Sequence, residues 1–185
     1  MAYHGAWHNT AAWLYLSSHG LYGLLWALKS QVFPDKRFLA PAGAGVGLIT
    51  WSMLSAYWFS PWIIARDNVQ PPAWYLGACM ASFGVGVFMH FCSDMQKHVQ
   101  LQLRPGKLVN TTLWAHCRNP NYFGELLIYT GFTALSMHWG PLTFLAAVVV
   151  LFWIPQMRQK DKSLSRYPEF AEWKARSSLF IPFVW

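Results

Sequence analysis

Asn121, Glu125 and Tyr129 recur every four residues along the stretch "CRNPNYFGELLIYTGF", residues 117–132. Side chains spaced i, i+4 and i+8 share one face of an α-helix, so the spacing predicts an amide, a carboxylate and a phenol side by side. The helix dipole favours a carboxylate in a first turn by about 0.3–1 kcal/mol. An ionisable side chain among apolar neighbours is instead a functional hypothesis by default. Both interpretations of Glu125 remain open.

A second polar series lies upstream, in "HFCSDMQKHVQLQLRPGK". His90, Asp94 and His98 again follow at i, i+4 and i+8, but histidines eight residues apart are separated by about 12 Å along a straight helix. Both cannot bind one ion, so we expect no metal here. Asp94 can pair with Lys97 or His98 along the helix. The alternative is a polar face that meets a ligand.

The composition indicates the elements that must position these residues. The chain is 55% hydrophobic and 11% charged, against roughly 25% charged in an ordinary soluble domain. Its 12 Trp and 8 Tyr suit membrane interfaces. Apolar segments of about 17–25 residues fit membrane spans, and five such segments lie near 11–28, 40–60, 73–92, 122–139 and 141–157. We therefore predict an all-α polytopic membrane protein with about five transmembrane helices.

The basic residues predict an orientation for these spans. Of the 14 Lys and Arg residues, the five-span arrangement leaves Arg66 alone on one side and places the rest on the other. This asymmetry predicts that the C-terminus faces the cytoplasm or the mitochondrial matrix. A basic face beside a bilayer attracts anionic lipids; the alternative is a site for a phosphate-rich ligand. Nucleic acid is not expected as a partner, because the basic residues flank apolar segments.

Two further segments are informative, the first apolar segment and the C-terminal tail. Ser17, Ser18, His19 and Gly20 lie in the middle of the first apolar segment, and we expect this polar group to turn toward other helices. His19 is either a functional group or a hydrogen-bonded packing residue. The C-terminal tail, residues 158–185, predicts a short amphipathic helix, with Glu172 and Arg176 paired at i,i+4 and with Phe170 and Trp173 on the apolar side. Its final "LFIPFVW" should fold back on the basic face or the bilayer.

Four motifs resemble, in the same order, the C-terminal half of the steroid 5α-reductase-like membrane family, which includes relatives of undefined substrate (the DUF1295 type). They are "SDMQK", "LRPGKLV", "LWAHCRNPNYFGE" and "SLSRYPEFAEWKARSSLFIPF". The resemblance covers about residues 75–185. It suggests one membrane domain over 1–185, with N-terminal helices in 1–72 and the reductase-like region in 73–185. Isoprenylcysteine and phospholipid methyltransferases share the plan but tend to show "RHPxY" at this place.

The resemblance implies a membrane reductase whose C-terminal helices and loops hold NADPH from the cytoplasmic side. By position in the motifs, the residues that it implies for the cofactor are Asp94, Arg104, Asn121, Tyr122 and Glu125. The chain departs from the steroid enzymes at His90, where they carry asparagine, and at Gln156 and Lys160, where they carry histidine and tyrosine. The catalytic acid is not assigned: the family keeps a Glu on early helices, and no Glu precedes residue 66 here.

Three functions remain open after this comparison of motifs. The first is an NADPH-dependent reductase of a sterol-like or polyprenyl-like carbon–carbon double bond. The second is a non-catalytic accessory subunit of a larger membrane complex, and the third is a lipid methyltransferase that uses S-adenosylmethionine. The expected partners are membrane lipids, a lipid-like substrate and, for the second function, other membrane subunits. The expected location is the endoplasmic reticulum, the bacterial inner membrane or the mitochondrial inner membrane. The groups considered as an acid are Tyr15, His19, Tyr22 and Tyr57.

Overall fold

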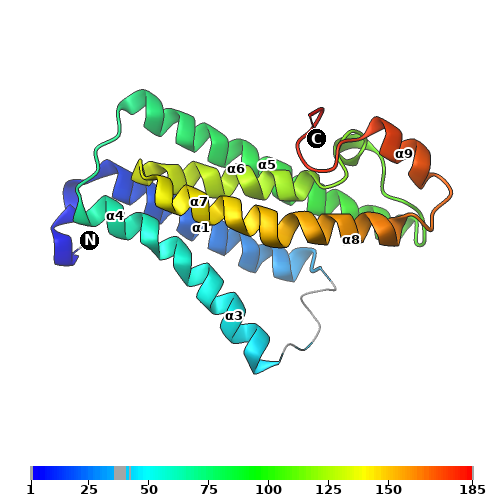
Figure 1. Cartoon of the computed structure of the whole chain (residues 1–185), viewed down its shortest axis with the longest axis horizontal. Coiled ribbons are helices and arrows are strands. Elements are labelled where there is room, and N and C mark those ends of the chain that lie inside the picture. Colours follow the sequence, from blue (N-terminus) through cyan, green and yellow to red (C-terminus); the bar gives the residue numbers. More distant parts are fainter. Residues whose placement is uncertain (1, 36–40, 42, 185) are drawn as a thin grey trace. The chain divides into compact units, whose positions relative to one another are not determined.

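The computed structural model describes residues 2–35, 41 and 43–184. Lys36, Arg37 and the start of the second apolar segment lie outside the described residues. The described chain is helical, with one isolated bridge between Cys117 and Ser178 as its extended pairing. In chain order its elements are η1 (Ala2–His4), η2 (Ala6–His8), α1 (Thr10–Val32), α3 (Ala44–Ser55), η3 (Ala56–Trp58), α4 (Phe59–Arg66), α5 (Ala73–Leu103), η4 (Thr112–Trp114), α6 (Pro120–Thr133), η5 (Ala134–Ser136), α7 (Trp139–Val148), η6 (Val149–Trp153), α8 (Ile154–Leu164) and α9 (Phe170–Arg176) (Figure 1).

The chain divides into two compact units, which are described separately. The first unit comprises 1–83 and 129–145, and the second comprises 84–128 and 146–185. The helices α5, α6 and α7 each contribute residues to both units.

The first unit is tied together at the start of α1 by a buried asparagine. The Asn9 side chain caps this helix by accepting a hydrogen bond from the Ala12 N–H at 2.9 Å. Its amide group also donates to Asn68 Oδ1 and to the Val69 carbonyl, both at 3.0 Å. One side chain therefore satisfies a free helix donor and joins α1 to the segment that follows α4.

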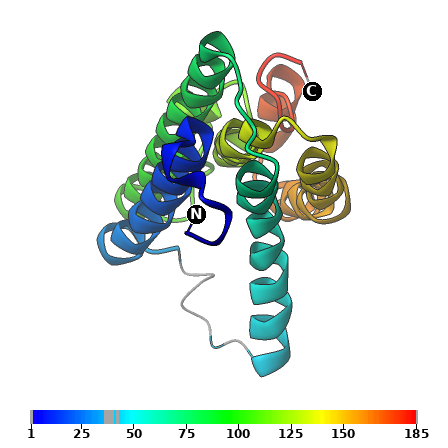
Figure 2. The same ribbon diagram turned by 90° about the vertical axis from the view of Figure 1, so that its left-hand side faces the viewer.

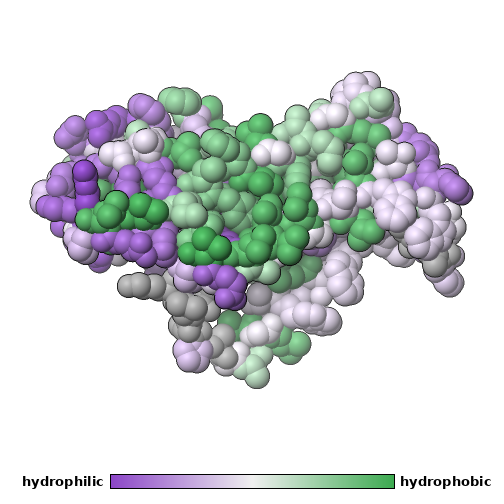
Figure 3. All heavy atoms as spheres, turned by 180° about the vertical axis from the view of Figure 1, so that it is seen from behind, coloured by the Kyte–Doolittle hydropathy of each residue, from purple (hydrophilic) through white to green (hydrophobic). Residues whose placement is uncertain are grey.

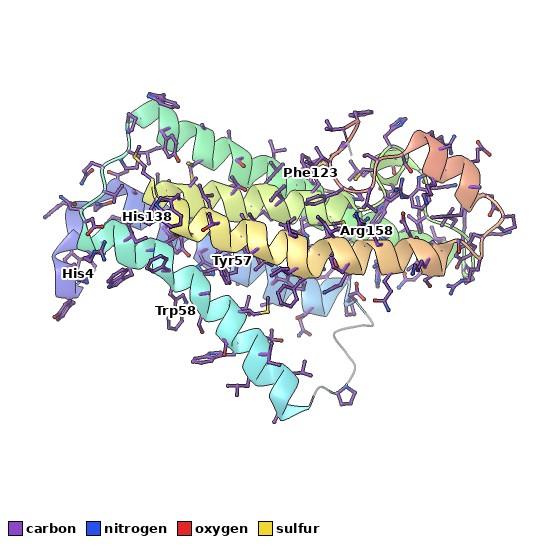
Figure 4. The ribbon with its side chains drawn as sticks, in the orientation of Figure 1. His4, Tyr57, Trp58, Phe123, His138 and Arg158 are labelled. Carbon is purple, nitrogen blue, oxygen red and sulfur yellow. The ribbon has the colours of Figure 1, made fainter. Side chains whose placement is uncertain are left out.

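Aromatic rings fill the interior of the first unit. The Tyr15 hydroxyl on α1 donates to the Tyr57 carbonyl on η3 at 2.7 Å. The Tyr57 ring, labelled in Figure 4, stacks on Tyr129 of α6 with 4.6 Å between centroids, and Phe132 meets Tyr15 and Tyr57 edge-on. Offset and edge-to-face contacts of this kind each add about 0.5–1.5 kcal/mol beyond burial.

The helix α3 has no buried residue over Ala44–Ser55. It runs through η3 into α4, and Figures 1 and 2 both show it leaving the side of α1, while α4 contacts α1. Its exposed side chains include Leu48, Ile49 and Trp51. An apolar helix that buries no residue against the described part of the chain fits a lipid environment or a contact with another chain.

A cluster of aromatic side chains closes one end of the second unit. Trp114, Phe170 and Trp173 are buried together. The Trp173 indole N–H donates to the Trp114 carbonyl at 2.8 Å, and the Trp114 indole N–H donates to the Ser93 carbonyl of α5 at 3.1 Å. The predicted amphipathic helix is confirmed as α9, and its apolar residues Phe170 and Trp173 pack against Trp114.

The chain from Trp139 to Leu164 is helical throughout, but its middle is wider than an α-helix. Val149–Trp153 form a π-helix, and Pro155 follows in the first turn of α8. A proline inside an α-helix removes one hydrogen bond and clashes with the carbonyl four residues earlier, here Leu151. The Leu151 carbonyl lies within the π-helical turn, so the proline explains why the helix widens there.

Two helical runs are long and apolar enough to cross a membrane, Ala73–Leu103 and Trp139–Leu164. A helix of 31 residues is about 46 Å long, so α5 exceeds a hydrocarbon core of about 30 Å. The count of about five spans is not confirmed: α3 and α4 are separate short helices, and α6 ends after 14 residues. Ten of the 14 basic residues belong to the second unit, and Figure 3 shows hydrophilic side chains gathered over its α8–α9 end.

We predict that Trp173→Ala loosens the tail. Trp173 is 1% exposed, and removing a buried tryptophan typically costs about 3–5 kcal/mol. Thermal unfolding in detergent should shift to lower temperature, and limited proteolysis should cut first within the tail. The matched control is Phe183→Ala, because Phe183 is 83% exposed. Equal stability of the two variants would contradict the docking of α9.

Candidate functional site

Two glycines bring α5 and α6 into backbone contact in the second unit. A Cβ added to Gly86 would lie 2.6 Å from the Ile128 nitrogen and 2.7 Å from the Gly124 carbonyl oxygen. A Cβ on Gly124 would collide with the His90 backbone nitrogen. Small residues at a helix interface allow such close approach. The side chains that flank these glycines therefore face each other at short range.

His90 is the centre of the polar cluster that results. It is 2% exposed, and its Nδ1 lies 3.2 Å from the Asn121 carbonyl and 4.0 Å from Glu125 Oε1. Its Nε2 lies 3.8 Å from Asp94 Oδ2. A carbonyl can only accept, so this contact favours the tautomer with the proton on Nδ1. The interface thus brings together Asp94, Asn121 and Glu125, three of the five residues that the sequence implied.

The Asn121 side chain supplies a polar atom that the described residues do not satisfy. Its Oδ1 is buried and has no hydrogen-bond partner among them. A buried amide oxygen without a partner costs about 1–3 kcal/mol. Such an oxygen can accept a hydrogen bond from a ligand or a water.

The residues that depart from the steroid enzymes lie against this motif. Gln156 Oε1 accepts from the Tyr122 hydroxyl at 3.2 Å. One turn later on α8, the Lys160 ammonium donates to Asn119 Oδ1 and to the Arg118 carbonyl, both at 2.9 Å. Tyr122 therefore contacts α8. Gln156 and Lys160 bind the start of α6 through side chains that differ from the histidine and tyrosine of the steroid enzymes. Sequence spacing could not reveal these pairs, which are 34 to 42 residues apart.

Arg118 has a buried ion pair that the motifs did not indicate. Its Nε donates to both oxygens of Asp161 at 3.2 and 3.0 Å, and its Nη1 donates to the Ser177 carbonyl and hydroxyl. The pair is almost fully buried, and losing one partner of such a pair costs about 3–5 kcal/mol. It ties the α6 motif to α8 and to the tail at once.

The tail also runs beside the segment before α6. The Arg118 N–H donates to the Ser178 carbonyl at 2.9 Å, and the Ser178 N–H donates to the His116 carbonyl at 3.0 Å. The Cys117 thiol donates to the Phe180 carbonyl at 3.2 Å. Burial raises the pKa of the Cys117 thiol above its ordinary value, so the group stays protonated at neutral pH and serves as a hydrogen-bond donor.

Arg104 lies apart from the His90 cluster, at the end of α5. It lines a pocket of about 540 Å³ together with Gln100, Lys107, Thr111 and Glu169, which we call the Arg104 pocket. Ten residues of helix separate Arg104 from Asp94, a distance of about 15 Å along the axis. The pocket therefore offers two cations at some distance from the acceptors of the cluster. Tyr129, predicted on the face of Asn121 and Glu125, stacks on Tyr57 in the first unit.

We predict that Gly124→Ala disrupts the α5–α6 contact. The added Cβ must displace backbone atoms, and overpacking typically costs about 1–3 kcal/mol. Gly84→Ala is the matched control, since an added Cβ there meets nothing within 4 Å. Thermal unfolding in detergent should separate the two variants. A Gly124→Ala protein as stable as Gly84→Ala would contradict the geometry.

Comparison with known proteins agrees with the motifs. The family model of proteins of unknown function DUF1295 matches residues 50–177. The chain is 25% identical over 108 residues to "Steroid 5-alpha-reductase DET2" of Solanum lycopersicum, an alignment that covers 56% of this chain and 42% of that relative. No solved structure matches the chain. The protein therefore belongs to the DUF1295 family, consistent with the wider group of steroid 5-alpha-reductase-like proteins.

Proposed function

We propose that the protein is a membrane reductase that uses NADPH to reduce a carbon–carbon double bond of a lipid. The observation that carries this proposal is the His90 cluster, in which the Asn121 main-chain carbonyl and the carboxylates of Asp94 and Glu125 lie around His90. The Asn121 side-chain oxygen is buried beside this contact and has no hydrogen-bond partner among the described residues. The cluster is built by the segment that matches the DUF1295 family, within residues 50–177.

The residues present fit the two ends of NADPH. Its nicotinamide carboxamide and ribose hydroxyls are hydrogen-bond donors, and the partnerless Asn121 Oδ1 is an acceptor of the kind they require. Its phosphates require cations, and Arg104 and Lys107 line the Arg104 pocket. When bound, NADPH would supply the hydride. The residues of the chain would orient the nicotinamide and hold the phosphates.

The lipid class follows from the membrane character and from the relative. Two helices have the length and apolarity of membrane spans, so a substrate dissolved in the bilayer would reach the protein without crossing water. The relative is named as a steroid reductase, and the chain spans 42% of its length. On this basis the substrate is a sterol-like or polyprenyl-like lipid. The basic residues would face the cytoplasm or matrix, together with the C-terminus.

One observation favours a second function, that of an accessory subunit. The helix α3 buries no residue over Ala44–Ser55 and exposes apolar side chains along its length. A partner subunit could cover this helix as well as lipid could. The fold would then support an assembly, and the His90 cluster would be a polar contact without a ligand.

The first test of the reductase is NADPH binding to the purified chain. Glu125→Gln and Asn121→Ala should each weaken binding about tenfold, because one hydrogen bond is worth up to about 1.5 kcal/mol and about 1.4 kcal/mol corresponds to a factor of ten in affinity. Fluorescence titration measures this without any lipid substrate. Glu172→Gln is the control, since this carboxylate is 80% exposed on α9.

If neither NADPH nor S-adenosylmethionine binds in these titrations, the result would favour the accessory subunit. Co-purification in a fixed ratio with larger membrane proteins would then be the expected result. Binding of S-adenosylmethionine alone would indicate a methyltransferase.

A separate prediction concerns the Arg104 pocket. The double variant Arg104→Ala/Lys107→Ala should weaken NADPH binding and flatten its dependence on salt, because fewer cations remain to be screened. Titrations at low and high salt measure both effects. Arg158→Ala is the control: Arg158, labelled in Figure 4, is exposed on α8 and does not line this pocket. An unchanged salt dependence would place the phosphates elsewhere.

A further inference from the structure

A second pocket lies within the first unit and contains none of the residues that the sequence implied for the cofactor. It has a volume of about 490 Å³, within the range of small-molecule sites. Its wall on α1 includes Tyr15, His19, Gly20 and Gly23, and its opposite wall includes Trp58 and Pro61 from η3 and α4. We call it the His19 pocket; Trp58 is labelled in Figure 4.

The two glycines create the space on the α1 side. A Cβ added to Gly20 or Gly23 would meet nothing within 4 Å, so the backbone of α1 borders an open volume at both positions. Any larger side chain there would project into the pocket. The lining is otherwise apolar and aromatic, apart from His19. The pocket therefore suits a hydrophobic molecule rather than a hydrated one.

His19 is the polar group that this pocket offers. Its ring stacks on Phe132 with 5.1 Å between centroids and meets Tyr15 edge-on at 5.4 Å, so its orientation is set by packing. Among the described residues its ring nitrogens have no hydrogen-bond partner, whereas the Tyr15 hydroxyl donates to the Tyr57 carbonyl and the Ser18 hydroxyl to the Leu14 carbonyl.

The contacts in the pocket distinguish among the four side chains considered as an acid from the sequence. Tyr15 lines the pocket, but its hydroxyl proton is already committed to the Tyr57 carbonyl. Neither Tyr22 nor Tyr57 lines the pocket; both pack their rings on Tyr129. A neutral imidazole offers one donor and one acceptor, so His19 can bind either a carbonyl or a hydroxyl oxygen.

We propose that the His19 pocket binds an apolar lipid that carries a carbonyl or hydroxyl oxygen, with His19 hydrogen-bonded to that oxygen. The inference rests on the proposed function in that this lipid would be the substrate or product of the reductase. The lining suits a lipid with a small polar group, because glycine, aliphatic and aromatic residues make up its walls apart from His19. His19 is thereby a substrate-binding residue.

Photo-labelling of the purified full chain in lipid nanodiscs tests this proposal. The probe is a long-chain alkyl ketone that carries a diazirine, and the matched probe is the same chain without the carbonyl. Mass spectrometry should place the ketone label on peptides from α1 or α4, and an excess of unlabelled ketone should remove it. The hydrocarbon probe should label these peptides several-fold less.

Three variants make the result specific. Gly23→Leu should abolish the competed label by filling the pocket, while Gly77→Leu should not, because Gly77 is exposed on α5, also borders open space and does not line the pocket. His19→Phe should keep the stacking but lower ketone labelling to the level of the hydrocarbon. Equal labelling of Gly23→Leu and Gly77→Leu, or no preference for the ketone in the unmodified chain, would overturn the proposal.

The outcome is separable from that of the reductase. Labelling requires neither NADPH nor turnover. A competed ketone label in a chain that does not bind NADPH would leave the lipid site standing and remove the reductase. NADPH binding without a competed ketone label would overturn the lipid site and leave the proposed reductase standing.

Discussion

The backbones of α5 and α6 approach so closely at Gly86 and Gly124 that neither position has room for a Cβ, and the polar cluster depends on this contact. His90 reaches the Asn121 carbonyl, Glu125 and Asp94 because no side chain separates the two helices there. A wider interface would expose these groups to lipid or water. Burying titratable side chains is unfavourable, and the packing of the two helices offsets this free energy.

The same segment is fixed from two further directions. Arg118, immediately before the helix, pairs with Asp161 on α8 and with the Ser177 region of the tail, and Asn119 is bound by Lys160 and by the Leu179 carbonyl. The side-chain donors of Arg118 and Asn119 thus have acceptors in other parts of the chain. This rigidity suits a site that must hold a ligand in one orientation.

Helical periodicity was sufficient to place Asn121 and Glu125 on one face. Apolar runs located the starts of α1, α5, α6 and α7 within a few residues, but not their ends, since α5 continues to Leu103. Periodicity could not identify partners across the chain: the contacts of Arg118 with Asp161 and of Lys160 with Asn119 join residues more than 40 positions apart. Nor could it tell which of several polar groups on α1 is engaged, because the Tyr15 hydroxyl is satisfied by a main-chain carbonyl. The number of spans stays a prediction, since two helical runs have the length and apolarity to cross a membrane and apolar composition does not reveal that η3 interrupts the run from α3 to α4.

The π-helical turn at Val149–Trp153 has a consequence for comparing this chain with its relatives. One additional residue in a turn offsets everything that follows by about 100° around the helix axis. A helical wheel drawn straight from Trp139 to Leu164 would therefore assign Gln156 and Lys160 to the wrong face, although both contact the start of α6. Relatives without a proline at the position of Pro155 would lack the cause of the offset. Their α8 would then present different side chains to the same motif even where the aligned residues are identical.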